Sequence, residues 1–260
     1  VRSRRQRQMC IRDSYVYRVA NNGAINITTV KGAPGFWIMP SAKVSVGTSN
    51  KPVVQDKSPV VPSTTDKFVI VIDPGHGAGI AHNRGGLLFN EGDQNYKFSQ
   101  YFMSEANKYS NVIVKTTRPY NDSDPSLEDR ARAGAGADLY LSLHTNAMPV
   151  TYSTTGKIIR GDNVRGVEVH SSNYSQNINM AYQITDMVSS TLGTPNRGVK
   201  FAQYSGEIYG RPIAGGKDYY AVFRNGNTAP TRYLIEFVFH TNLEDSQACL
   251  LYTSPSPRDR

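Results

Sequence analysis

The chain of 260 residues has room for one domain of about 170–200 residues and a smaller piece. Its composition, with 38% hydrophobic and 10% aromatic residues, is ordinary for a globular protein. No run of about 18 apolar residues occurs and no apolar stretch follows the basic N-terminus, so we expect neither a transmembrane helix nor a signal peptide.

The net charge of +8 is concentrated at the two ends of the chain. Residues 1–14 and 249–260 together hold seven arginines and two aspartates, so the interior is only weakly basic. Both ends resemble translated sequencing-adapter read-through, and we interpret them as non-native tails; the alternative is a genuine basic arm. Both cysteines, Cys10 and Cys249, lie in these tails. The interior therefore has no disulfide framework and no cysteine-based zinc site.

The first structured region is predicted to be rich in β-strands. Residues 15–48 alternate short runs of β-formers with turn sequences, and a Gly-Phe-Trp-Ile stretch near its end resembles the closing strands of small wall-binding barrels. This segment is either a truncated wall-binding barrel or an irregular β-extension of the main domain, since so few residues hardly bury a core alone. Residues 49–66 contain three prolines and no period, and we expect a linker there.

From residue 67 onward the pattern predicts strands that alternate with helices. Long polar or glycine-rich loops are expected at 75–90, 145–163 and 193–230, and loops of such length are usually functional. The alternation predicts an α/β fold with a mixed, largely parallel central sheet and helices on both of its faces. The strands are expected at 68–73, 111–116, 138–144, 167–170 and 232–239, and the helices at 91–109, 126–133 and 175–192.

Three candidate metal ligands stand at element ends. His76 follows the first strand of the main domain, His144 ends the third strand, and Glu91 opens the first helix. Ligands collect at the carboxyl ends of strands in α/β sheets, and a helix N-terminus favours an ionised carboxylate. Two imidazoles and one carboxylate are a typical zinc set for hydrolysis. Each residue alone has a structural explanation, and the combination predicts a metal site.

A general base is also needed for such chemistry. Glu236 is the best candidate, because a carboxylate among Leu, Ile, Phe and Val is costly unless it is used or paired; an edge-strand charge is the alternative. The remaining histidines are expected in surface or loop positions. Among them His82 is a rival ligand in the same loop as His76, His240 could line the cleft, and His170 has no assigned role.

Taken together, these segments resemble the zinc-dependent N-acetylmuramoyl-L-alanine amidases of bacterial autolysins and phage endolysins. The matching motifs occur in the order of the family across residues 68–245. They are Val-Ile-Asp-Pro-Gly-His-Gly (71–77), Asn-Glu-Gly-Asp-Gln-Asn (90–95), Ser-Leu-Glu-Asp-Arg-Ala (126–131), Asp-Leu-Tyr-Leu-Ser-Leu-His-Thr-Asn-Ala (138–147), Asn-Arg-Gly-Val-Lys (196–200) and Leu-Ile-Glu-Phe-Val-Phe-His-Thr-Asn-Leu-Glu-Asp (234–245).

The resemblance implies a catalytic domain over residues 67–248 that binds one zinc ion through His76, Glu91 and His144. It implies hydrolysis of the amide between N-acetylmuramic acid and L-alanine in peptidoglycan, with Glu236 as the acid/base that moves a proton from water to the leaving amine. It further implies cell-wall lysis at an extracellular location. We expect a monomer that neither binds nucleic acid nor inserts into a membrane.

The sequence departs from the family pattern in three places. Ala78-Gly-Ile follows the first histidine motif and Phe237-Val-Phe-His240 follows the glutamate; both changes bear on substrate preference rather than on zinc. A closing helix is expected after Asp245, and the tail that starts at Cys249 would cut it short. Two alternatives remain open, namely another zinc amidohydrolase or peptidase, and an inactive wall-binding protein.

Overall fold

In the computed structural model, the described residues are 15–19, 25–28, 36–38, 67–78, 83–149, 151–152, 154, 158–160 and 163–253. The chain divides into two compact units, Val1–Lys67 and Phe68–Arg260. The smaller unit contains a three-stranded antiparallel sheet in the order β1-β2-β3. Its strands are β1 (Tyr15–Val19), β2 (Ile25–Thr28) and β3 (Phe36–Ile38), in line with the β-strands predicted for 15–48; the end of that segment, from residue 39, lies outside the described residues.

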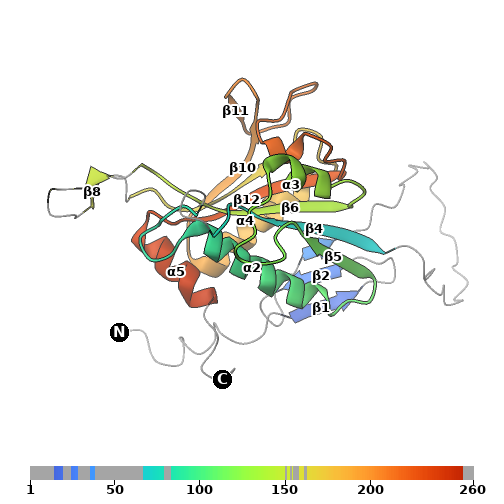
Figure 1. The fold of residues 1–260 in the computed structure, drawn as a ribbon, viewed down its shortest axis with the longest axis horizontal. Helices are drawn as coiled ribbons and strands as arrows, with labels where there is room; N and C mark the ends of the chain where they lie inside the picture. Colours follow the sequence, from blue (N-terminus) through green and yellow to red (C-terminus); the bar gives the residue numbers. More distant parts are fainter. Residues whose placement is uncertain are drawn as a thin grey trace, which may run out of the picture. The chain divides into compact units, whose positions relative to one another are not determined.

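The larger unit is built on a seven-stranded mixed sheet in the order β11-β10-β9-β12-β6-β4-β5 (Figure 1). Strand β4 pairs in parallel with β5 and β6, β6 with β12, and β9 with β10, whereas β12–β9 and β10–β11 are antiparallel. The α/β class with a largely parallel sheet is therefore confirmed. The strands are β4 (Phe68–Pro74), β5 (Val112–Thr116), β6 (Leu139–Asn146), β9 (Val167–Ser171), β10 (Asn196–Ala202), β11 (Ile208–Tyr209) and β12 (Thr231–Phe239).

Helices cover both faces of this sheet, as the alternating pattern predicts. Figure 1 shows α3 on one side of the sheet and α2, α4 and α5 on the other. Helix α2 packs on β4, β5 and β6, and α4 packs on β9 and β10, while α3 contacts the short 3-10 helix η1. None of the helices among the described residues is long and apolar enough to cross a membrane. The bounds are α2 (Glu91–Ala106), α3 (Leu127–Ala133), α4 (Ile178–Leu192), η1 (Ala221–Phe223) and α5 (Leu243–Thr253).

The strand register places polar side chains of several strands on one face of the sheet. Asp73 pairs with Ser142 on β6, and Glu236 lies between His144 of β6 and Glu168 of β9. Because side chains alternate along a strand, these five residues point to the same side. The same face carries a core cluster that includes residues of η1, so η1 and α3 cover this face and leave its carboxyl edge beside His144 accessible.

Two stretches expected to be loops contain strands. The segment 193–230 includes β10, which pairs with β9 and buries Val199, Phe201 and Ala202, and also the short strand β11. Its polar start and Gly198, with φ of +79°, hide the strand pattern in the sequence. The segment 145–163 includes the two-stranded sheet of β7 (Thr151–Tyr152) and β8 (Ile158–Arg160). These strands are too short to show an alternation of apolar and polar residues in the sequence.

Two predicted helices differ in detail. Helix α2 ends at Ala106 rather than at 109, and its buried face is polar, because Gln94, Asn95 and Ser99 are buried whereas the aromatic Tyr101 is exposed. Helix α5 is the closing helix expected after Asp245, and it continues through the buried Cys249 to Thr253. Packed structure thus extends five residues beyond the expected end of the domain at residue 248. That the two ends are non-native tails stays a prediction.

Candidate metal centre

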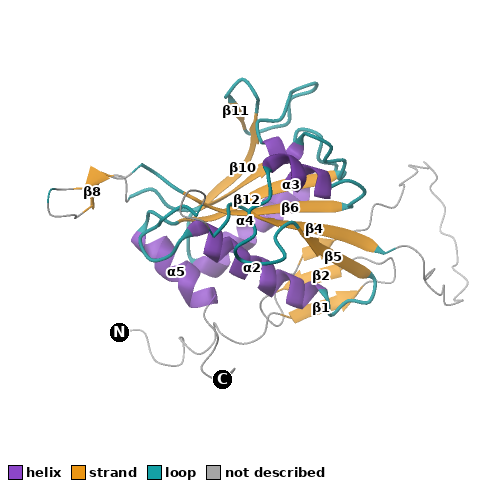
Figure 2. Cartoon of the chain, in the orientation of Figure 1, coloured by secondary structure: helices purple, strands orange, loops and turns teal. Residues whose placement is uncertain are grey.

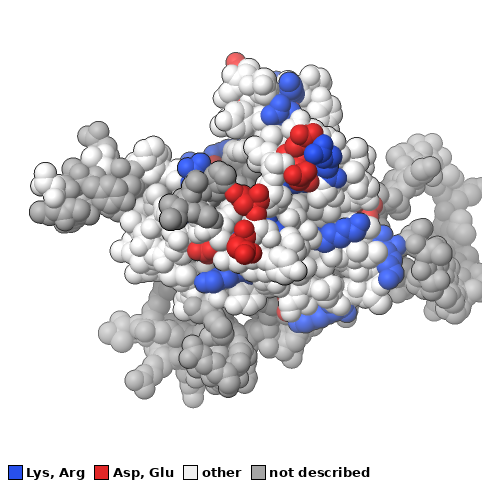
Figure 3. Space-filling view, in the orientation of Figure 1, with Lys and Arg blue, Asp and Glu red and all other residues white. Residues whose placement is uncertain are grey.

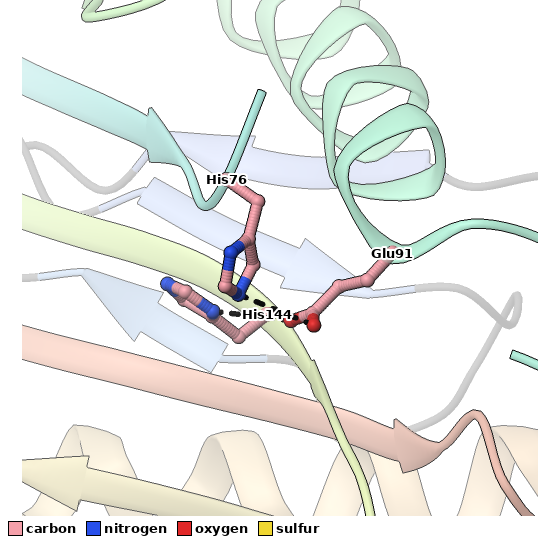
Figure 4. Close-up of side chains that lie close together, drawn as sticks. All are labelled: His76, Glu91 and His144. Atoms are coloured by element: carbon pink, nitrogen blue, oxygen red, sulfur yellow. Dashed lines mark hydrogen bonds and ion pairs between the residues drawn. The ribbon is translucent and has the colours of Figure 1, made fainter. Parts of the chain in front are cut away.

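His76, Glu91 and His144 meet at the carboxyl edge of β4 and β6 (Figure 4). The Nε2 atom of His76 lies 3.2 Å from Glu91 Oε2, and Nδ1 of His144 lies 3.1 Å from Glu91 Oε1. One ligand atom from each residue lies within 4.8 Å of the others. The three residues that the sequence predicts as ligands are therefore brought together, and an ion could be held between them.

A tight turn after β4 positions the first imidazole. His76 has φ of +62°, a conformation that a non-glycine residue adopts only when its surroundings hold it there. Gly75 lies so close to the His144 ring that a methyl group on its Cα would be 2.6 Å from Nδ1 and closer still to Cε1 and Nε2. The glycine thus allows the second imidazole to pack against the turn that carries the first.

Arg130 of α3 holds this turn in place through hydrogen bonds to its backbone. Its guanidinium donates hydrogen bonds to the carbonyl oxygens of Pro74 and His76, at 2.7 Å each, and to Asp73 Oδ1 at 2.8 Å. Asp73 also accepts from Thr117 Oγ1 at 2.6 Å and, through Oδ2, from Ser142. Burial alone would raise the pKa of Asp73, but Arg130 and the two hydroxyl groups hold it below its usual value. The buried pair therefore stays charged and anchors the His76 backbone.

A second buried arginine supports the other side of the turn. Arg118 donates to the carbonyl oxygens of Gly75 at 3.3 Å and Gly92 at 2.9 Å, so it ties the turn to the first residues of α2. Neither Arg118 nor Arg130 is assigned a role from the sequence. Arg130 is visible there only as part of the Ser-Leu-Glu-Asp-Arg-Ala motif, and backbone carbonyl acceptors leave no signal in a sequence.

Glu91 is 3% exposed and is held by neutral donors as well as by the imidazoles. The backbone N–H of Thr145 donates to its Oε1 at 3.0 Å. Burial would raise the pKa of Glu91, but hydrogen bonds and charge from His144 and His76 lower it below its usual range. Burial likewise would lower the pKa of His144, but Glu91 raises it. The carboxylate is thus ionised and aimed between two imidazoles.

His240 lies in the layer behind Glu91. The sequence predicts a surface or loop position for it, but it is buried, and its Nδ1 lies 2.9 Å from Thr145 Oγ1 and 4.0 Å from Glu91 Oε2. Burial lowers its pKa, although Glu91 opposes that shift. His240 therefore neighbours the metal centre. The rival ligand His82 lies outside the described residues.

A cavity of about 730 Å³ opens beside the two imidazoles, and Glu236 lies in its wall. The Oε2 atom of Glu236 is buried and has no hydrogen-bond partner among the described residues. Burial raises the pKa of Glu236 to about 8, with Glu91 and Glu168 adding to that shift and His144 opposing it. A cation bound by the three ligands would lower this pKa toward neutrality, where a general base works best.

Behind Glu236, a second acidic residue is fully paired. Glu168 accepts a hydrogen bond from Asn146 Nδ2 at 2.8 Å and pairs with Arg197 at 2.9 Å and with Lys200. Burial would raise its pKa, but these partners and the nearby His170 lower it below the usual range. His170, also expected at the surface, is buried in β9. Glu168 thus remains a structural anion, in contrast to the unpaired Glu236.

Comparison with known sequences identifies the family. A family model described as N-acetylmuramoyl-L-alanine amidase matches residues 70–251. N-acetylmuramoyl-L-alanine amidase LytC of Bacillus subtilis (strain 168) is 32% identical over an alignment of 192 residues that covers 71% of this chain and 34% of that protein. The chain thus spans about a third of the length of that relative.

Solved structures share the fold. The N-acetylmuramoyl-L-alanine amidase from Clostridium difficile 630 aligns with a TM-score of 0.55 at 21% identity, over 73% of this chain and 90% of that chain. The catalytic domain of CwlV, N-acetylmuramoyl-L-alanine amidase from Bacillus (Paenibacillus) polymyxa var. colistinus, aligns with a TM-score of 0.50 at 20% identity, over 70% and 86% of the two chains. At such identities the likeness concerns the fold alone.

Proposed function

Because the chain belongs to the N-acetylmuramoyl-L-alanine amidase family, we propose that it hydrolyses the amide between N-acetylmuramic acid and L-alanine in peptidoglycan. The observation that carries this proposal is the convergence of His76, Glu91 and His144 beside the unpaired acid Glu236 at one end of an open cavity. Buried polar atoms are normally hydrogen-bonded, so a purely structural role would leave the buried, unpartnered oxygen of Glu236 unexplained.

The three ligand residues fit a single zinc ion. Two imidazole nitrogens and one carboxylate oxygen are the donor atoms that zinc takes in hydrolytic enzymes, and the cavity leaves room for water or substrate. The hydrogen bond from Thr145 to Glu91 helps to orient one ligand. When bound, zinc supplies a Lewis acid that polarises the amide carbonyl and makes water more acidic.

Glu236 carries the proton transfers. Its carboxyl group lies in the cavity wall near His144, so it can accept a proton from the attacking water. The protonated acid then donates that proton to the nitrogen of the departing L-alanine peptide as the C–N bond breaks. Burial keeps the proton available, because it raises the pKa of Glu236.

The partner and the place of action follow from the substrate. The family acts on the cell wall, outside the cytoplasm, and we place this chain there as a monomer that works on peptidoglycan. On the face in Figure 3, basic side chains of the described residues lie in separate small groups, so they form no continuous basic patch there of the kind that binds a nucleic acid.

The smaller unit, which includes residues 15–48, is a candidate wall-binding element that precedes the catalytic domain in the chain. Co-sedimentation with purified cell walls tests this role. The chain that lacks residues 1–66 should bind the wall more weakly than the whole chain, and equal binding by both would remove the role.

The proposed activity is tested on purified peptidoglycan. We expect the wild-type protein to release stem peptides with a free N-terminal L-alanine, detected by labelling of new amino groups. Glu236→Gln and His144→Ala should release none, whereas Lys115→Gln, at an exposed position of the edge strand β5, should match the wild type. Release of single amino acids from the peptide would instead indicate a peptidase, and full activity of Glu236→Gln would remove the proposed base.

A further inference from the structure

The cavity extends from the metal centre to a wall of aromatic and cationic side chains. Tyr204, Tyr219 and Tyr220 line it together with Arg224, and Leu127 lies on the same rim. Most of this wall comes from the segment between β10 and β12, which projects from the sheet on the side of α3 (Figure 2). The segment therefore forms one side of the space in which a substrate would lie.

Arg224 differs from the other residues of the cavity wall in its charge. It is the only lysine or arginine among the described residues that line the cavity, and no ion pair with a carboxylate is found for it within that set. Its guanidinium donates to the carbonyl oxygens of Tyr219 at 3.1 Å and Tyr220 at 3.4 Å. Because an arginine has five N–H donors, others remain for a ligand.

The side chain of Tyr204 holds this arginine in place. The guanidinium carbon of Arg224 lies 4.6 Å from the centre of the Tyr204 ring, and Lys217 Nζ lies 4.0 Å from the same centre. Tyr204 itself is 58% exposed, so the arrangement stands at the mouth of the cavity. A fixed guanidinium with a second cation nearby favours an anion, and its planar fork matches a carboxylate.

We propose that Arg224, supported by Tyr204, binds a carboxylate of the stem peptide and so places the leaving-group side of the substrate in the cavity. This inference rests on the proposed amidase function. In that substrate the acetylated sugars are neutral and the lactyl carboxyl group is consumed in the scissile amide, so the anionic groups lie on the peptide. Arg224 is thus complementary to the peptide and not to the glycan.

The rival occupant is the sugar chain, since sugars often stack on exposed aromatic rings. Two cations already lie over the Tyr204 ring, which makes that ring a poor platform for a sugar. Tyr219 is also exposed, but its ring packs edge-on against Tyr220 at 5.2 Å. The charge of the wall therefore favours the peptide.

The experiment compares two synthetic muramoyl peptides that differ only in whether the peptide carboxylates are free or converted to carboxamides. For the zinc-loaded whole chain we expect kcat/KM to be about tenfold higher for the free acid, because its KM is lower. A tenfold difference is at the lower end of what a hydrogen bond to a charged group contributes. Arg224→Gln should bring the ratio of the two substrates close to one, and Arg224→Lys should keep part of the preference.

Two further variants and the melting temperatures distinguish a folding defect from the loss of the carboxylate-binding subsite. Lys115→Gln removes an exposed lysine from β5, at the opposite edge of the sheet, and should keep the wild-type ratio. Tyr204→Leu keeps the guanidinium of Arg224 but removes the ring that supports it, and should reduce the ratio only in part. Melting temperatures of all variants identify any that fail to fold.

The outcomes separate this inference from the function on which it rests. If the wild-type protein cleaves both substrates with equal kcat/KM, the subsite is refuted and the amidase function stands. If it cleaves neither, both proposals fail. If Arg224→Gln lowers both rates equally while the preference persists, the carboxylate is recognised elsewhere and the assignment to Arg224 is overturned.

Discussion

Replacing Gly75 by alanine should damage the metal centre without unfolding the protein. The φ angle of Gly75 lies outside the left-handed region, so the backbone itself accepts alanine. The new methyl group, however, would lie 2.6 Å from Nδ1 of His144, whereas ordinary contacts begin near 3.4 Å. The imidazole must therefore move by about 1 Å, and misplacement of this size typically costs a factor of about 100 in rate or affinity.

The assay for this prediction is a zinc titration in competition with a chromophoric chelator, accompanied by thermal unfolding without metal. We expect zinc affinity to fall about 100-fold for Gly75→Ala. The matched control is Gly210→Ala, because an added methyl group there meets no atom within 4 Å and the φ angle is also outside the left-handed region. Wild-type zinc affinity in Gly75→Ala would refute the packing argument, since the ring would then not need its present position.

Four further predictions concern stability. Arg130→Met should lower the free energy of unfolding by about 3–5 kcal/mol in urea denaturation, because Asp73 would be left as a buried charge without its cation. For Asp73→Asn, the loss of stability should be large at pH 7 and shrink as the pH falls below about 4. The folded pKa of Asp73 lies below the usual 3.8, so its carboxylate stabilises the fold fully above pH 3.8, and this stabilisation disappears as the pH falls through the folded pKa. A loss of stability that does not change with pH would contradict this. Asp245→Ala should cost about 3 kcal/mol or more, since the buried backbone N–H groups of Gly166 and Phe239 would lose their acceptor, and calorimetry measures this loss. Chelation of zinc should lower the melting temperature, and the effect should vanish in His76→Ala; an equal shift in that variant would indicate zinc bound elsewhere.

Three residues of the site were predictable from sequence because each stands out from the local pattern around it. His144 follows the five strand residues Leu139–Leu143, and Glu236 interrupts an apolar strand, so both stand out from their surroundings. Glu91 was predictable because a carboxylate suits the first turn of a helix. In all three cases local pattern and tertiary position agree: Glu91 and His144 lie together with His76, and Glu236 lines the cavity beside His144.

The residues that hold the site in position were not predictable from the sequence, because their role depends on contacts between segments far apart in the chain. Arg130 and Arg118 bind backbone carbonyl oxygens of the His76 turn from more than 40 residues away. His240 is buried because β6 and β12 are neighbours, and its sequence position at a strand end gives no sign of that. Strand β10 was missed because its core residues are few and its start is polar. Such features become visible only when the sheet order is known.

The most direct test of the account is the zinc content of purified variants measured together with their turnover on peptidoglycan. The wild-type protein should hold one zinc per chain, His144→Ala should lose most of it, and Glu236→Gln should retain it while losing turnover. This pattern would assign metal binding and proton transfer to separate residues. Turnover by a protein without zinc, or by Glu236→Gln at the wild-type rate, would contradict the account.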